Sequence, residues 1–77
     1  MRVVVNVTGH SYQFFPGKKS RIEVDLPAPA SVREILAHLG VKPELIMLVS
    51  SGGEVRTKDY VPEDGEEVTL VSPPSGG

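Results

Sequence analysis

SVREILAHLG, residues 31–40, predicts one amphipathic helix, around which the other predicted elements are arranged. Ser31 is followed three residues later by Glu34, the pattern of a capping box in which each side chain accepts the other residue's backbone N–H. Apolar residues recur at positions 32, 35, 36 and 39, and this spacing predicts one buried stripe. Gly40 is expected just past the helix end, and Pro43 prevents the helix from continuing.

Two predicted strands precede the helix. Residues 2–8 are almost all β-formers, and residues 21–26 alternate between apolar and polar side chains. The residues expected to face the core from these strands are Val3, Val5, Val7, Ile22, Val24 and Leu26. Residues 9–20 contain Pro16-Gly17 and are predicted to form a long hairpin connection, into which the strands could extend.

Further strands are predicted after the helix. The apolar run at residues 46–49 reads as a strand with neighbours on both sides. Ser51-Gly52-Gly53-Glu54 is predicted to be a tight turn, because glycine supplies the positive φ that hairpins need. Val55-Arg56 would be a very short strand, residues 58–65 a loop with turns, and residues 66–72 the last strand.

This order of elements predicts an α+β chain with a β-grasp, or ubiquitin-like, fold. The fold has a mixed four- to five-stranded sheet with one main helix packed across it, and its first and last strands lie parallel at the centre. We expect a single β-grasp domain over residues 1–72. Residues 73–77 are expected to form a flexible C-terminal tail that ends in Gly-Gly.

Composition excludes several classes of function. The chain has 77 residues and no cysteine, which removes disulfides, thiolate nucleophiles and cysteine metal sites, and suits a cytoplasmic protein. A net charge of −2 provides no basic field for nucleic acid, and no apolar run is long enough for a membrane span. His10 and His38 have no partner at ligand spacing, so no metal site is expected. The carboxylates of Asp64, Glu66 and Glu67 are expected to face solvent.

The chemically unusual part of the chain is Pro73-Pro74-Ser75-Gly76-Gly77. Two prolines keep a segment extended, and glycines without Cβ atoms fit a narrow channel. If Gly77 ends the chain, its carboxylate could be activated by ATP as an acyl-adenylate inside an enzyme that excludes water. From composition alone, an inert glycine- and serine-rich terminus is equally compatible with this ending.

A β-grasp domain of this length with this ending resembles the MoaD/ThiS family of ubiquitin-like sulfur carriers. The resemblance covers most of the chain and is strongest over residues 31–77. It is carried by the helix with Gly40, by Pro43-Glu44 and the strand after it, by the turn at residues 51–54, and by Asp64-Gly65-Glu66-Glu67-Val68. Pro73-Pro74 is similar to small subunits of molybdopterin synthase, whereas the region between helix and tail is more like thiazole-pathway carriers. Residues 9–20 are longer than expected in either.

The resemblance implies a carrier rather than an enzyme. An E1-like adenylating enzyme would use ATP to activate Gly77, a persulfide would supply sulfur, and the resulting thiocarboxylate would serve the large subunit of an acceptor synthase. The pathway would be molybdopterin, thiamine-thiazole or thiolated tRNA synthesis. Pro73, Pro74, Ser75 and Gly76 would occupy the partner's channel, and the chain itself would bind no cofactor. A ubiquitin-like modifier joined to lysines through Gly77, or a plain β-grasp interaction domain, are the alternatives.

An outward-facing apolar surface is the last expectation. Val4 and Val71 alternate out of phase with the predicted core residues, and so does Met47 if Leu48 points inward. An exposed apolar patch formed by these three residues would suit docking to partner enzymes. Isolated apolar residues on a surface are common, however, and need no functional explanation.

Overall fold

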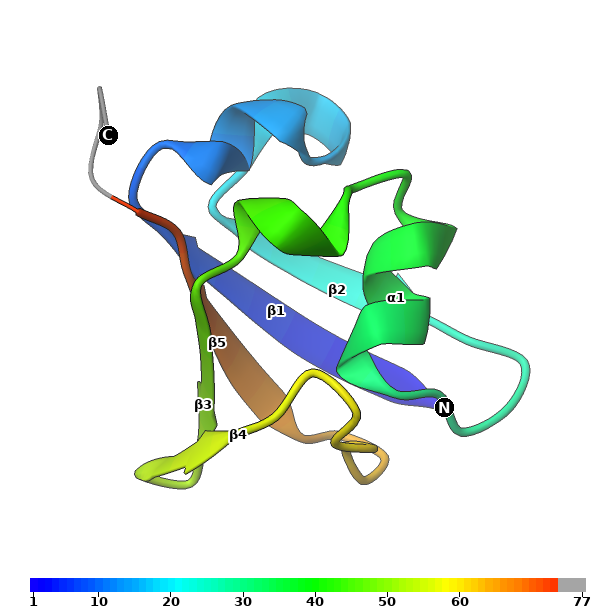
Figure 1. The fold of residues 1–77 in the computed structure, drawn as a ribbon. Coiled ribbons are helices and arrows are strands. Elements are labelled where there is room, and N and C mark those ends of the chain that lie inside the picture. Colours follow the sequence, from blue (N-terminus) through cyan, green and yellow to red (C-terminus); the bar gives the residue numbers. More distant parts are fainter. Residues whose placement is uncertain (74–77) are drawn as a thin grey trace.

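The computed structural model describes residues 1–73, and within them five strands form one mixed sheet (Figure 1). The strands are β1 (Arg2–Thr8), β2 (Arg21–Asp25), β3 (Leu48–Ser51), β4 (Glu54–Arg56) and β5 (Glu67–Val71). Their order across the sheet is β2-β1-β5-β3-β4. β1 and β5 are parallel neighbours at the centre, and the other pairs are antiparallel. The predicted β-grasp arrangement is therefore confirmed.

The helix α1 (Val32–His38) crosses one face of the sheet and has the predicted caps (Figure 1). Ser31 Oγ accepts the backbone N–H of Glu34 at 3.1 Å, and the Glu34 carboxylate accepts the N–H of Ser31 at 2.9 Å. These bonds to the charged form lower the pKa of Glu34 below its ordinary value. Gly40 follows the helix with φ of 77°, a conformation that glycine adopts readily.

One core lies between α1 and the sheet. The odd-numbered valines of β1 face the helix stripe, as predicted, and Val68 and Leu70 of β5 lie in the same core. Ile22 and Leu39 are partly buried against this core rather than fully enclosed by it. The buried apolar residues are Val3, Val5, Val7, Phe15, Val24, Leu26, Val32, Ile35, Leu36, Val41, Ile46, Val49, Val68 and Leu70.

The segment between β1 and β2 forms two short 3₁₀ helices, η1 (Ser11–Phe14) and η2 (Pro16–Lys18). The strands do not extend into it. Phe15, between the two helices, is only 3% exposed and belongs to the core. The connection therefore packs onto one end of the domain instead of projecting from it.

The strand predicted at residues 46–49 begins two residues later than expected. A 3₁₀ turn, η3 (Pro43–Leu45), ends at Ile46, whose N–H still bonds to Pro43 O at 3.0 Å. Ile46 is buried and Met47 is exposed before the regular alternation of β3 starts. The predicted neighbours on both sides are confirmed, since β3 lies between β5 and β4.

The tight turn between β3 and β4 is also confirmed. Gly52 and Gly53 have φ of 61° and 79°, and Ser51 pairs with Glu54 across them. None of the helices within residues 1–73 has the length and apolar character needed to cross a membrane.

Candidate functional site: the base of the C-terminal segment

The predicted reactive end lies beyond the part of the chain that the structure describes. Pro74, Ser75, Gly76 and Gly77 are outside the described residues, and Pro73 is the last described residue and is exposed. What the structure defines is the base from which this segment leaves. That base follows β5 directly, beside the end of β1 (Figure 1).

Ser72 anchors this base to β1 and η1. Its N–H donates to Thr8 O at 3.2 Å, which extends the pairing of β1 and β5 beyond Val71. Its hydroxyl donates to the same carbonyl at 2.6 Å and accepts the N–H of Ser11 at 3.3 Å. Ser72 is 7% exposed, so these bonds are made in a largely dry environment and satisfy groups that water does not reach.

Gly9 is the residue that lets Ser72 come so close. It has φ of 86°, and a Cβ placed on it would lie 2.2 Å from Ser72 Oγ. Any larger residue at position 9 would therefore displace the base of the C-terminal segment. From the sequence, Gly9 was assigned only to the connection at residues 9–20, and Ser72 was assigned to the last strand without any special role. The predicted parallel pairing of the first and last strands was the signal that could have brought them together.

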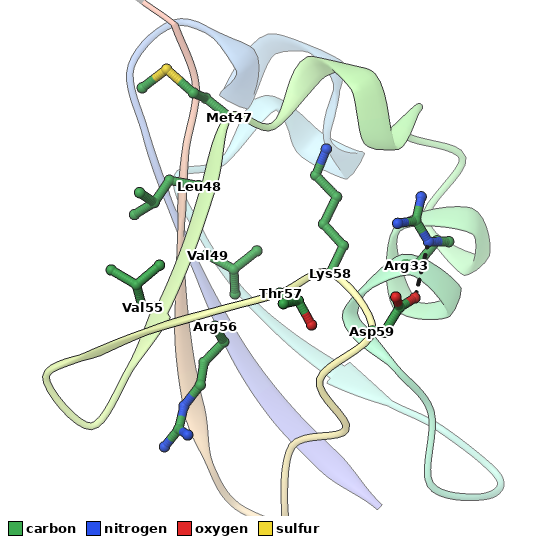
Figure 2. Close-up of a pocket in the computed structure, with 9 residues that line it drawn as sticks. All are labelled: Arg33, Met47, Leu48, Val49, Val55, Arg56, Thr57, Lys58 and Asp59. Atoms are coloured by element: carbon green, nitrogen blue, oxygen red, sulfur yellow. Dashed lines mark hydrogen bonds and ion pairs between the residues drawn. The ribbon is translucent and has the colours of Figure 1, made fainter.

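The predicted docking residues are only partly brought together. Val4 and Val71 both lie half-buried on the outward face of the central strands, and Met47 is 60% exposed. Met47 was expected to face outward on the condition that Leu48 points inward. That condition was wrong, because Val49 points into the core and Leu48 lies outward, opposite Val71. Figure 2 shows the side chains of Met47 and Leu48 on one side of β3, with Val49 on the other.

Leu48, Val71 and Met47 therefore form one apolar cluster at the end of the sheet where the C-terminal segment begins. The N–H of Met47 donates to Val71 O at 2.8 Å, which holds the cluster together. Val4 lies apart from it, in register with Glu23 and Glu67. Between Val4 and this cluster runs the polar row Asn6–Thr69–Ser50.

On β1, β2 and β5, most of the remaining outward face is charged and paired, whereas Val55 of β4, in register with Ser50, is apolar and 69% exposed. Arg2 Nε donates to Asp25 at 2.8 Å, and Arg21 lies 3.1 Å from Glu67, which also accepts a hydrogen bond from the Asn6 amide. The hydrogen bond to Arg2 lowers the pKa of Asp25, and Asp25 in turn raises the pKa of Arg2. Exposed pairs of this kind contribute little to stability.

A shallow cavity of about 290 Å³ lies beside β3 and β4 (Figure 2). Its cationic side chains are already engaged within the domain. Arg33 bonds to Asp59 at 3.3 Å, and Lys58 Nζ donates to Pro43 O at 2.7 Å. The lining residues are Arg33, Met47, Leu48, Val49, Val55, Arg56, Thr57, Lys58 and Asp59. The lining contains no histidine or cysteine, and its one carboxylate, Asp59, is paired with Arg33. The cavity therefore provides no recognisable catalytic arrangement.

Glu66 was expected to face solvent, and that expectation was wrong. It is half-buried, accepts the Tyr60 hydroxyl at 2.6 Å and the Glu63 N–H at 2.9 Å, and also accepts the Ser51 hydroxyl. Burial alone would raise the pKa of Glu66, but these three hydrogen bonds lower it overall, and Glu66 raises the pKa of Tyr60. Glu66 accepts hydrogen bonds from Ser51 of β3 and from Tyr60 and Glu63 of the loop between β4 and β5. Its role is therefore to hold this loop against β3.

No metal site is found among residues 1–73. No group of three histidine, cysteine, aspartate or glutamate side chains there is close enough to hold an ion. His10 and His38 are both exposed.

No protein-family model and no curated protein sequence matches the chain. Two solved structures share its fold along their whole length. SAMP1 from Haloferax volcanii superposes with a TM-score of 0.71 at 20% sequence identity, covering 100% of both chains. A chain from the protein–protein complex of subunits 1 and 2 of molybdopterin-converting factor from Helicobacter pylori 26695 gives a TM-score of 0.60 at 20% identity, again covering 100% of both. With the strand order and the crossing helix, these likenesses establish that the chain has the β-grasp, ubiquitin-like fold.

Proposed function

We propose that this protein is a sulfur carrier of the MoaD/ThiS type that works through the carboxylate of Gly77. The observation that carries the proposal is the anchored base at Ser72. A buried hydrogen-bonded residue at the end of a central strand holds a segment whose sequence is Pro-Pro-Ser-Gly-Gly. The fold shared with a chain of the molybdopterin-converting factor complex supports the same reading.

The chemistry proceeds in two stages. First, a carboxylate oxygen of Gly77 attacks the α-phosphorus of ATP and displaces pyrophosphate, forming an acyl-adenylate. The terminal sulfur of a partner persulfide then attacks the acyl carbon, and AMP leaves. The acyl carbon is then joined to the persulfide through a new C–S bond. A second partner thiol attacks the inner sulfur and cleaves the S–S bond of the original persulfide, so the thiocarboxylate of Gly77 is released while the two partner thiols are oxidised to a disulfide. Sulfur nucleophiles react as thiolates, which is why the second stage needs partner cysteines that this chain lacks.

In this proposal the protein is a co-substrate of other enzymes. ATP is bound by the E1-like adenylating enzyme, the persulfide belongs to a sulfur donor, and the acceptor is the large subunit of a synthase, all in the cytoplasm. Pro73, Pro74, Ser75 and Gly76 occupy the partner's channel. The cluster of Met47, Leu48 and Val71 beside Ser72 is the proposed docking face, and Val4 contributes at most at its margin.

The test is the intact mass of the protein purified gently from its native host, which also identifies the C-terminal residue. Replacing one carboxylate oxygen by sulfur adds about 16 Da, nearly the same mass as oxidation of a methionine. Met47 is 60% exposed and is a ready oxidation site. We therefore expect the added mass to react with a thiol-selective alkylating agent and to disappear when Gly77 is deleted.

The other outcomes are equally informative. Adducts of this chain on lysines of other proteins, lost on deletion of Gly77, would establish the ubiquitin-like modifier instead. An unmodified chain in cells that contain an active adenylating enzyme would leave only a β-grasp interaction domain.

A further inference from the structure

The connection between β1 and β2 carries most of the aromatic residues of the protein. The chain has two tyrosines and two phenylalanines, and three of these four lie at Tyr12, Phe14 and Phe15. Phe15 is buried in the core, but Tyr12 is 37% and Phe14 60% exposed. Phe15 fixes the connection to the domain. The exposed aromatic rings of Tyr12 and Phe14 are therefore not needed to hold the connection in place.

The structure ties these rings to the base of the C-terminal segment. η1 begins at Ser11, whose N–H donates to Ser72 Oγ, and Gly9 packs directly against the same hydroxyl group. At its other end, η1 leads directly into Phe15, which is buried in the core. η1 is thus held at both ends, and its backbone lies at the end of the molecule where β5 ends (Figure 1).

The separation of Pro73 from Gly77 determines how close a partner that adenylates Gly77 must come. Gly77 is the fourth residue after Pro73, and four residues span at most about 14 Å even when fully extended. An enzyme that adenylates Gly77 encloses that carboxylate to exclude water. Its walls must therefore reach to within this distance of Pro73, which follows Ser72, the residue to which η1 is bonded.

We propose that η1, through Tyr12 and Phe14, is a contact surface for the adenylating enzyme that takes up the C-terminal segment. This inference rests on the proposed function. Aromatic residues are enriched in the desolvated centres of protein interfaces, where they supply much of the binding energy. The surface is distinct from the cluster at Met47, Leu48 and Val71, because it belongs to the β1–β2 connection rather than to the outward face of the sheet.

The charge of the connection specifies the partner surface further. Residues 9–20 contain Lys18 and Lys19 and no aspartate or glutamate, although the whole chain has 10 acidic residues. The matching surface on the enzyme is therefore apolar with an acidic rim. Opposite charges on the two rims increase the association rate, and this contribution falls as salt is added.

The experiment measures exchange of radiolabelled pyrophosphate into ATP, which reports reversible adenylation of Gly77. Purified chain is titrated into a desalted extract of its native host. For Phe14→Ser we expect KM for the chain to rise about tenfold with kcat unchanged, because a contact made equally in ground and transition states affects KM alone. Tyr12→Ser is expected to raise KM by a smaller factor. Val61→Ser is the matched control, since Val61 is 48% exposed in the loop between β4 and β5, and it should leave KM unchanged.

The outcomes separate this inference from the proposed function. A wild-type KM in folded Phe14→Ser and Tyr12→Ser variants would overturn the contact surface while adenylation itself stands. If Phe14→Ser altered only self-association in sedimentation experiments, the patch would be a contact between copies of this chain, and the inference would be wrong. If the wild-type chain supported no exchange, the proposed function and this inference would both fail.

Discussion

At the scale of single residues, the most informative pair is Ser11 and Ser72, two buried serines in contact through one hydrogen bond. Ser72 uses its hydroxyl both to donate to Thr8 O and to accept the N–H of Ser11. The hydroxyl of Ser11, by contrast, has no hydrogen-bond partner within residues 1–73. The two side chains therefore have opposite energetic roles, although their positions and burial are nearly the same.

We expect Ser72→Ala to lower the free energy of unfolding by about 1–3 kcal/mol, because it leaves the buried N–H of Ser11 unpaired. Ser11→Ala should be neutral or slightly stabilising, since it removes a buried hydroxyl that bonds to no described residue and keeps the N–H that bonds to Ser72. Urea denaturation of both variants measures the difference. Equal losses in the two would show that the Ser72 hydroxyl does not hold this junction.

At the scale of elements, the helix and the strands could be predicted from the sequence, but the contacts where these elements meet could not. The capping box at Ser31 and the alternation in β1 depend only on near neighbours, so they could be identified from residue spacing. Met47 and Glu66 could not be placed in this way. The burial of Glu66 depends on donors from β3 and from the loop before it, and the exposure of Met47 depends on where the 3₁₀ turn ends. The Ser72 junction was missed for the same reason, since its partners lie more than 60 residues away.

The loop between β4 and β5 should make stability depend on pH through Glu66. Its folded-state pKa is lowered, so its contribution to stability is present above the pKa of unfolded glutamate and is lost as pH falls through the folded-state value. We expect Glu66→Gln to weaken the fold at neutral pH and to flatten the loss of stability on acidification. Denaturation by urea at a series of pH values below neutrality measures both effects.

Glu44→Gln is the control for this pH dependence, because Glu44 is exposed and accepts none of the hydrogen bonds found for the described residues. Asp25 and Glu34 also have lowered pKa values, so Glu66→Gln should remove only part of the slope. An unchanged slope in Glu66→Gln would mean that these hydrogen bonds do not favour the charged carboxylate.

At the scale of the whole molecule, the features around Pro73 share one end of the domain. The outward cluster of Met47, Leu48 and Val71 lies on the sheet beside Ser72, and η1 is bonded to the same residue. The charged pairs and the polar row occupy most of the rest of the outward face, which also contains the apolar residues Val4 and Val55. A protein that binds this end would meet apolar side chains from two separate elements around the start of the C-terminal segment, which supports the carrier role proposed above.

The outward cluster can be tested with one charge at two positions of the same strand. Val71→Glu places a carboxylate in the cluster. Thr69→Glu places a carboxylate two residues earlier on the same face, outside the cluster. Thr69 is in register with Asn6 of β1, and Asn6 is in turn in register with Arg21 of β2. Both positions are half-buried on the outward side, so both variants are expected to fold. In the pyrophosphate exchange assay, we expect Val71→Glu to reduce kcat/KM by about tenfold or more, because an unpaired charge buried at an interface is costly. We expect Thr69→Glu to change kcat/KM little. Equal values of kcat/KM for the two folded variants would show that the cluster of Met47, Leu48 and Val71 is not part of the docking surface. In that case η1 would remain as the proposed contact.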